Sequence, residues 1–210
     1  QDAIDGAPLG VWRIAVEEAL RAARNLVSDL LWSTLIKNPN CPDGLPLFST
    51  DRGNLTNAAL DTSPLDLAMA AIGGHVGVDE VGNPVHYNLK PDRLIVCPSA
   101  LQSARRLVRP SILDGGELRV LAESRLSDAG VTDPTTGEVL VGGSGSNWML
   151  AASGQQKASI VLALLNGKTE PTVRQFALDG GQWGLGFDVS FSCAATALDG
   201  RPLYFSTSDG

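Results

Sequence analysis

Apolar residues recur at three- and four-residue spacing between Gly10 and Lys37, and no internal Gly or Pro interrupts the pattern. Charged side chains occupy much of the remaining surface, which is typical of an amphipathic helix with one buried face. The apolar stripe comprises Trp12, Val16, Ala19, Ala23, Leu26, Leu30 and Leu31. Such a helix would be about 40 Å long, so it needs an extended partner surface. Asn38 ends it, because a residue before proline avoids helical geometry.

The middle of the chain predicts two shorter helices and several strands. Ser63-Pro64 is expected to cap and open the second helix, which carries Leu65, Met69 and Ile72. Ser99 is expected to cap the third, over Leu101–Val108, before Pro110. Short apolar runs predict strands at 94–97, 118–121, 148–151 and 160–165. Gly82-Asn83-Pro84 predicts a turn, and the Gly-, Ser- and Thr-rich segment 127–146 predicts an exposed, mobile loop.

The last forty residues have a different pattern of apolar and polar positions. Apolar and small or polar residues alternate from Trp183 to Cys193, which predicts one long strand with a single buried face. A shorter strand is expected at 201–205, after an Asp199-Gly200 turn. One very long helix therefore begins the chain and one very long strand closes it. This order predicts that the two ends pack together around a separate middle lobe.

Charge and cysteine content narrow the class of function. The 210 residues carry 16 basic and 23 acidic side chains, for a formal charge of −7, so sequence-specific binding of nucleic acid is not expected. The three cysteines have no CxxC spacing, which favours a reducing compartment. No apolar run approaches the ~20 residues of a membrane span, and no signal peptide is visible. We expect a soluble protein made in a cytoplasm.

The sequence contains no recognisable catalytic constellation. His75 and His86 lack a partner motif for a metal, and Cys97 and Cys193 lie in apolar strand patterns where thiols pack inertly. The glycine-rich stretch 142–146 lacks the final glycine of a nucleophile elbow, and no phosphate-binding fingerprint is present. We therefore expect no catalytic residue, no metal, no cofactor and no enzymatic activity.

The order of several segments resembles the major head subunit family of Mu-like phages and prophages. The segments are LGVWRIAVEEALRAARNLVSDLLWSTLI, LFSTDRGNLTNAALDTSPLDLAMAAI, KPDRLIVCPSALQSARRLV, ELRVLAESRL, NWMLAAS, ALLNGKTEPTV and WGLGFDVSFSCAATALDGRPLYFS. Pro91 to Leu101 resembles the family phrase P-x-x-L-[IV]-V-P-x-A-L, with Cys97 inserted before the proline. The match extends over nearly the whole chain.

The resemblance implies an α+β fold of the Hong Kong 97 capsid type. Residues 1–39 would hold the spine helix of the peripheral domain, residues 40–171 the axial domain, and residues 172–210 the closing strands of the peripheral domain. The family's N-terminal arm and extended loop precede the spine helix, and neither is recognisable here. The chain starts at Gln1 without a Met, which indicates a processed or trimmed product. No lysine–asparagine cross-link is expected.

The implied function is a major capsid protein that self-assembles as pentamers and hexamers into an icosahedral shell around double-stranded DNA. Scaffold, portal and decoration proteins are candidate partners, the virion is the expected location, and assembly is expected in the host cytoplasm. A ring-forming tail, baseplate or head–tail adaptor protein is one alternative, and a small hydrolase is another. Candidate assembly residues are the arginines Arg105, Arg106 and Arg109 and, in the predicted loop, Asp133, Thr135 and Glu138.

Overall fold

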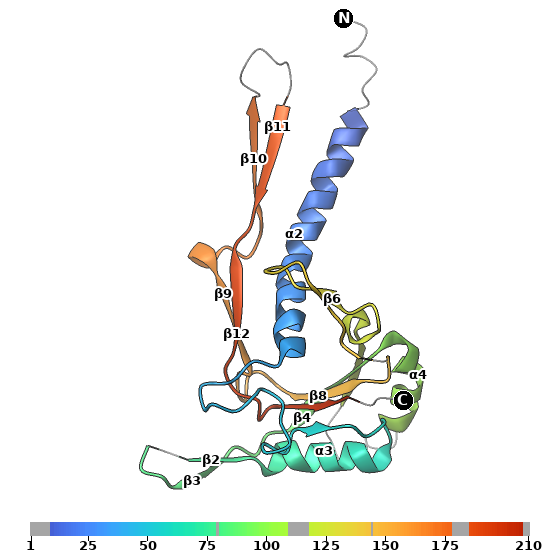
Figure 1. The fold of residues 1–210 in the computed structure, drawn as a ribbon, viewed down its shortest axis with the longest axis vertical. Coiled ribbons are helices and arrows are strands. Elements are labelled where there is room, and N and C mark those ends of the chain that lie inside the picture. The colour runs from blue at the N-terminus through green and yellow to red at the C-terminus, as the bar shows by residue number, and fades with distance from the viewer. Residues whose placement is uncertain (1–8, 79, 109–117, 144, 178–184, 208–210) are drawn as a thin grey trace, which may run out of the picture.

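A computed structural model describes residues 9–78, 80–108, 118–143, 145–177 and 185–207. Figure 1 shows a base built around a β-sheet, from which a long helix and a narrow β-ribbon rise side by side. Helices and several small sheets together make a mixed α+β protein, which is the predicted class at its coarsest level. In the described part of the chain no helix combines the length and apolar character that a membrane span requires.

The long helix α2 spans Leu9–Lys37, which confirms the predicted helix over residues 10–37. It ends where predicted, because Asn38 adopts a left-handed backbone conformation with φ of 51°. The Asn38 side chain donates to the carbonyl of Phe48 and accepts from the Phe48 amide, so the helix end is tied to the following loop. The predicted stripe is not a buried face: its described members are half-buried, apart from Ala19, which is exposed. The buried apolar residues of α2 are Trp32 and Leu35, outside the stripe, because only the last turns of the helix reach the core, whereas Ile14 is 56% exposed.

The base contains a five-stranded sheet in the order β1-β13-β8-β4-β5. Its strands are β1 (Leu55–Thr56), β13 (Leu203–Ser206), β8 (Trp148–Ala152), β4 (Pro91–Val96) and β5 (Arg119–Ala122). The outer pairs β1–β13 and β4–β5 are parallel, and β8 is antiparallel to both β13 and β4. The strands predicted near residues 94, 118, 148 and 201 are therefore confirmed and meet in one sheet.

Both faces of this sheet are covered, which explains why β8 is buried at every position. Trp148 and Leu150 point into one core with α3 (Thr62–Gly74) and α4 (Leu101–Val108). Met149 and Ala151 point into a second core that contains Trp32 of α2 and the loop residues Leu47 and Phe48. The sheet is thus the middle of three layers.

Two predicted helix caps are wrong. Asp61, not Ser63, caps α3, and its carboxylate accepts from the Thr62 amide. Ser99 lies inside a short 3₁₀ turn, η1 (Pro98–Ala100), which leads directly into α4, and its hydroxyl contacts the sulfur of Cys97. Each observed cap lies two residues before the expected one: Asp61 precedes Ser63, and Cys97 precedes Ser99, with Pro98 at the start of the turn.

The closing strand is also corrected. Instead of one strand over 183–193, the structure has β11 (Leu185–Ser190) and β12 (Cys193–Ala197), while Trp183 lies outside the described residues. β11 pairs with β10 (Thr172–Ala177), and β12 pairs with β9 (Ile160–Leu164). The opposite strand is interrupted by the turn η4 (Leu165–Gly167), where Asn166 and Gly167 have positive φ. The ribbon bends there, and the alternation of side chains continues through the bend.

Two further hairpins leave the main sheet. One, β2 (Val76–Val78) with β3 (Pro84–His86), contains the predicted turn near Gly82, whose φ is 91°. The other, β6 (Val131–Thr132) with β7 (Val139–Leu140), lies in the segment predicted to be an exposed loop. That prediction is corrected in part, because Val131 and Asp133 are buried, whereas the hairpin turn at residues 134–139 is exposed.

Strand pairing crosses the predicted domain boundary at residue 172. β9 lies before this boundary and pairs with β12 beyond it, and β13 completes the sheet that holds β8 and β4. α2 contacts β11 and β12, so the long helix and the closing ribbon do lie together. The division into peripheral and axial domains stays a prediction.

Candidate assembly surfaces

The FSTDRGN segment forms a buried junction between the first loop and the last strand. Asn54 is fully buried, and its Nδ2 donates to the carbonyls of Leu47, Gly200 and Leu203. Its Oδ1 accepts from the Ser49 amide at 2.9 Å. One amide therefore satisfies four backbone groups from segments far apart in sequence, which is a structural role.

Arg52 extends this junction with charge. Its guanidinium donates to both carboxylate oxygens of Asp43, at 2.8 and 2.9 Å, and lies 4.0 Å from Asp199. Hydrogen bonding to Arg52 lowers the pKa of Asp43 to about 2. Asp199 also pairs with Lys157 and Arg201. Each of these charged side chains has a partner of opposite sign, so the group contains no unpaired acid or base of the kind that catalysis needs.

A second set of ion pairs fastens the β6–β7 hairpin to α2. Lys37 binds Asp133, which is fully buried and also accepts from the Thr135 amide and the Thr136 hydroxyl. The Lys37 hydrogen bond, followed by that of Thr136, lowers the pKa of Asp133. Arg125 bridges Asp29 of α2, at 2.6 Å, to Glu123.

The structure separates the six candidate assembly residues. Asp133 points inward and holds its hairpin to α2, whereas Thr135 and Glu138 are exposed at the hairpin turn. Arg105 and Arg106 are exposed on α4, which packs on the sheet through Ala104 and Val108. Arg109 lies outside the described residues. The structure does not bring the arginines and the loop residues into one site, and an assembly role for any of them stays a prediction.

The histidines and cysteines form no reactive group in the described residues. Burial lowers the pKa of His75, and His86 is exposed on the neighbouring strand. Burial raises the pKa of both Cys41 and Cys193, which disfavours the reactive thiolate, and Cys97 is buried. Among the residues described, no three His, Cys, Asp or Glu side chains cluster as metal ligands.

The glycine-rich segment 142–146 is not a nucleophile elbow. A strand, β8, follows it, whereas an elbow leads into a helix. Asn147, which follows the segment, donates its side-chain amide to the Gly142 carbonyl.

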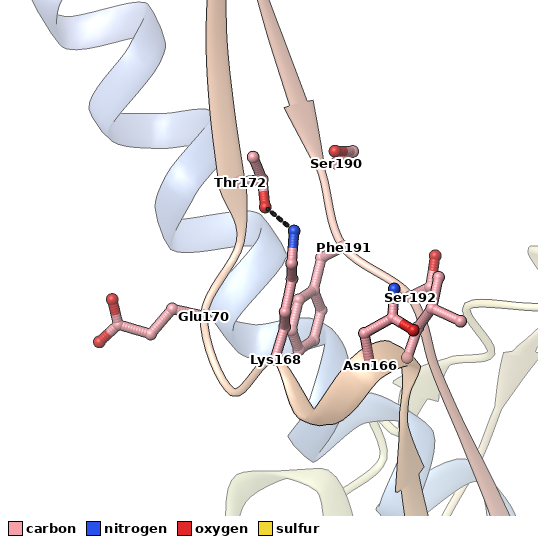
Figure 2. Close-up of a pocket in the computed structure, with 8 residues that line it drawn as sticks. Asn166, Lys168, Glu170, Thr172, Ser190, Phe191 and Ser192 are labelled. Carbon is pink, nitrogen blue, oxygen red and sulfur yellow. Dashed lines mark hydrogen bonds between the residues drawn. The ribbon is translucent and has the colours of Figure 1, made fainter.

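A small hollow lies where the ribbon bends, between η4 and the β11–β12 connection. Its polar lining residues include Asn166, Lys168, Glu170 and Ser192. Figure 2 shows Lys168 directed at the Thr172 hydroxyl, 3.2 Å away, while Glu170 points away from both. These groups do not converge on a common point, so the hollow offers no arrangement for acid–base or nucleophilic chemistry.

Exposed apolar side chains, which sequence reasoning missed, are the main feature of the surface. On the ribbon, Val173, Phe176 and Phe187 are between 39% and 49% exposed. On the β2–β3 hairpin, Val78 is 74% and Val81 is 86% exposed. Large apolar residues exposed together on projecting elements are typical of surfaces that a partner covers. The alternation of apolar and polar residues could not reveal these exposed side chains, because it predicts an apolar face but not whether this chain or a partner covers that face.

Comparison with known proteins gives one clear result. A family model described as "Phage capsid protein" matches residues 1–205. No curated protein matches the chain, and no solved structure matches it.

Proposed function

Because the chain belongs to the phage capsid protein family, we propose that it is the major capsid protein of a tailed phage or prophage. In this proposal it assembles with itself, as pentamers and hexamers, into an icosahedral shell that encloses double-stranded DNA. The family membership establishes a phage capsid protein and is consistent with a structural rather than an enzymatic role.

The shape of the subunit is the observation that carries the proposal. α2 and the β10–β11 ribbon project together from the base (Figure 1), and both expose apolar side chains, at Ile14 of α2 and at Phe176 and Phe187 of the ribbon. A two-stranded ribbon and a half-covered helix gain little stability alone in water. Neighbouring copies that cover these elements would bury the exposed apolar surface, which is the dominant source of association free energy.

We further propose that the fold is of the Hong Kong 97 type, in its Mu-like branch. The order of matching segments along the sequence supports this assignment, as does the packing of α2 against β11 and β12, the elements expected to form the peripheral domain. The sheet with α3 and α4 would be the core of the axial domain.

The remaining parts of the proposal are supported by the net charge of the chain and by its capsid family. A formal charge of −7 favours a shell that encloses DNA without binding its sequence. Scaffold, portal and decoration proteins would be further partners, assembly would take place in the host cytoplasm, and the virion is the location that a capsid family supports.

Electron microscopy of the full-length gene product, expressed in bacteria, tests the proposal. Icosahedral particles or sheets of hexamers are the expected result. A monomer under all conditions would contradict it, and a single closed ring of fixed size would replace it with an adaptor function.

A further inference from the structure

We infer that the β2–β3 hairpin of one copy inserts its tip into a hollow beside α4 of the next copy, and that this contact links subunits head to tail within a ring. The inference rests on the proposed self-assembly and names the two surfaces that would meet. Three observations support it: the position, the shape and the charge of these surfaces.

The hairpin and the hollow lie at opposite ends of the same strand. β3 leads into the start of β4, and Figure 1 shows the hairpin projecting from the base on the side away from α4. The hollow lies just beyond the end of β4, where η1 and α4 begin. Its lining residues are Cys97, Ser99, Ser127, Asp128, Ala129, Gly145 and Ser146. Complementary surfaces at opposite ends of one chain give a heterologous contact, which forms a ring when the rotation between copies closes.

The shapes of the two surfaces are complementary. The hairpin is a narrow two-stranded projection whose turn contains Gly82 with φ of 91°, and its most exposed apolar residues, Val78 and Val81, lie near the tip. The hollow is lined mostly by small side chains, among them Ala129 and Gly145, which leaves room for a turn. Insertion would remove the two valines from water, and burial of apolar surface favours association.

Charged residues of opposite sign lie at the hairpin tip and on α4, while the hollow itself contains one acidic residue, Asp128. Glu80 is exposed next to Val81 at the hairpin tip, whereas Arg105 and Arg106 are exposed on α4, which starts directly after the hollow's Ser99. The described residues show no ion pair for Arg105 or Arg106 within the chain. Opposite charges at the rim of an interface guide association and fix the register of the partners. This complementarity favours a second copy of the chain as the occupant of the hollow.

Cysteine cross-linking of the full-length protein tests this contact. Val81→Cys on the hairpin and Ala129→Cys in the hollow are combined in one chain that also carries Cys41→Ala, Cys97→Ala and Cys193→Ala, so that the three native thiols are removed. Under mild oxidation we expect a ladder of covalent oligomers that ends at closed rings, and only monomers from either single-cysteine chain. Cross-linking of Val81→Cys chains to one another would overturn the inference, because the hairpins would then meet symmetrically.

Charge reversal gives a second, independent measurement. Glu80→Arg alone, or Arg105→Glu with Arg106→Glu, should reduce the yield of assembled particles by about tenfold or more, and the combined variant should recover it. Asp66→Arg on the exposed side of α3 is the matched control and should assemble normally. Circular dichroism verifies that each variant is folded.

The possible failures are distinguishable. Normal particles from every charge variant, together with no cross-linked ladder, would overturn the hairpin contact and leave the capsid function intact. Absence of any assembly by the unaltered full-length protein, and of any ladder, would reject both.

Discussion

Asn54 shows how one side chain can fix the relation between distant parts of this chain. Its amide satisfies backbone groups of the first loop and of the last strand, in a position that is fully closed to water. A buried carbonyl without a donor costs free energy comparable to that of the lost hydrogen bond, so the effect of removing this amide exceeds the value of a single bond.

We therefore predict that Asn54→Ala lowers the free energy of unfolding by about 3 kcal/mol, because four buried hydrogen bonds are lost and only the Gly200 carbonyl keeps a second donor, the Leu203 amide, among the bonds described. Urea denaturation followed by tryptophan fluorescence measures the change. Asn57→Ala, at an exposed asparagine of the same segment, is the control and should have little effect. Equal stability of the two variants would contradict the junction role of Asn54.

Asp43 gives the fold a defined sensitivity to acid. Its pKa falls from an ordinary 3.8 to about 2 in the folded chain, chiefly because Arg52 donates hydrogen bonds to the carboxylate. A lowered folded-state pKa means that the unfolded state binds protons first as the pH falls. The contribution of Asp43 is therefore complete above pH 3.8 and is lost as the pH approaches 2.

We expect Asp43→Asn to reduce the loss of stability between pH 4 and pH 2, because the variant has no carboxylate to protonate at this position. Thermal unfolding at a series of pH values measures the slope, and Asp51→Asn, at an exposed carboxylate nearby, serves as the control. An unchanged acid slope in Asp43→Asn would show that the Arg52 pair does not contribute to stability.

At the residue scale, burial could be predicted where local spacing determines it, but not where it depends on a partner far away in the sequence. The spacing of Leu65 and Ile72 correctly indicated buried positions on α3. By contrast, nothing local marks Asp133 as buried, because its partner Lys37 lies 96 positions away. The same limit applies to Asn54, whose role depends on Gly200 and Leu203. Pairings over such separations are set by tertiary packing, which a single sequence does not display.

At the element scale, the β6–β7 hairpin depends on its attachment to α2. The two strands have two residues each, far too few for independent stability. The Lys37–Asp133 and Asp29–Arg125 pairs, together with buried Val131, hold the hairpin in place. Removal of one partner leaves the other charge uncompensated, which is the costly way to break such a pair.

We predict that Lys37→Met increases hydrogen exchange across residues 131–140 by tenfold or more, because the hairpin opens locally, while β8 stays protected. Native-state hydrogen exchange with mass spectrometry measures both regions in one experiment. Lys168→Met removes a lysine whose hydrogen bond to Thr172 is exposed, and it should leave the hairpin unaffected. A parallel increase in β8 would mean that the whole fold, and not one hairpin, had been destabilised.

Elements were predictable where one local pattern determines them. The uninterrupted stripe of α2 and the apolar runs of β4 and β8 correspond to the helix and strands observed. The division of the closing strand into β11 and β12 could not be predicted, because the alternation of apolar and polar residues continues past Phe191 although the chain bends there. The bend is located by η4 on the opposite strand, and a pairing partner is not visible in the sequence of the strand itself.

At the scale of the whole molecule, the ribbon and α2 expose apolar surface that the chain does not cover. Val173 and Phe187 lie in adjacent register positions on one face of the β10–β11 ribbon, and Phe176 lies opposite Gly186 on the other. Because both faces carry exposed apolar side chains, contact with α2 can cover only one of them. The uncovered face is the surface that a neighbouring subunit would bury.

Replacement of the exposed ribbon residues should reduce assembly and leave folding of the base unchanged. Val173→Ser, Phe176→Ser and Phe187→Ser combined should leave the base folded, since the two buried cores lie around the five-stranded sheet and do not include these residues. Assembly should fall by at least tenfold, because the contact loses most of its apolar area. Particle yield by electron microscopy and the unfolding midpoint of the monomer measure the two properties.

Leu67→Ser, at a residue of α3 that is 65% exposed, is the matched control away from the ribbon. Loss of monomer stability in step with assembly would place the ribbon within the folding core, whereas normal assembly by the triple variant would show that shell contacts form elsewhere.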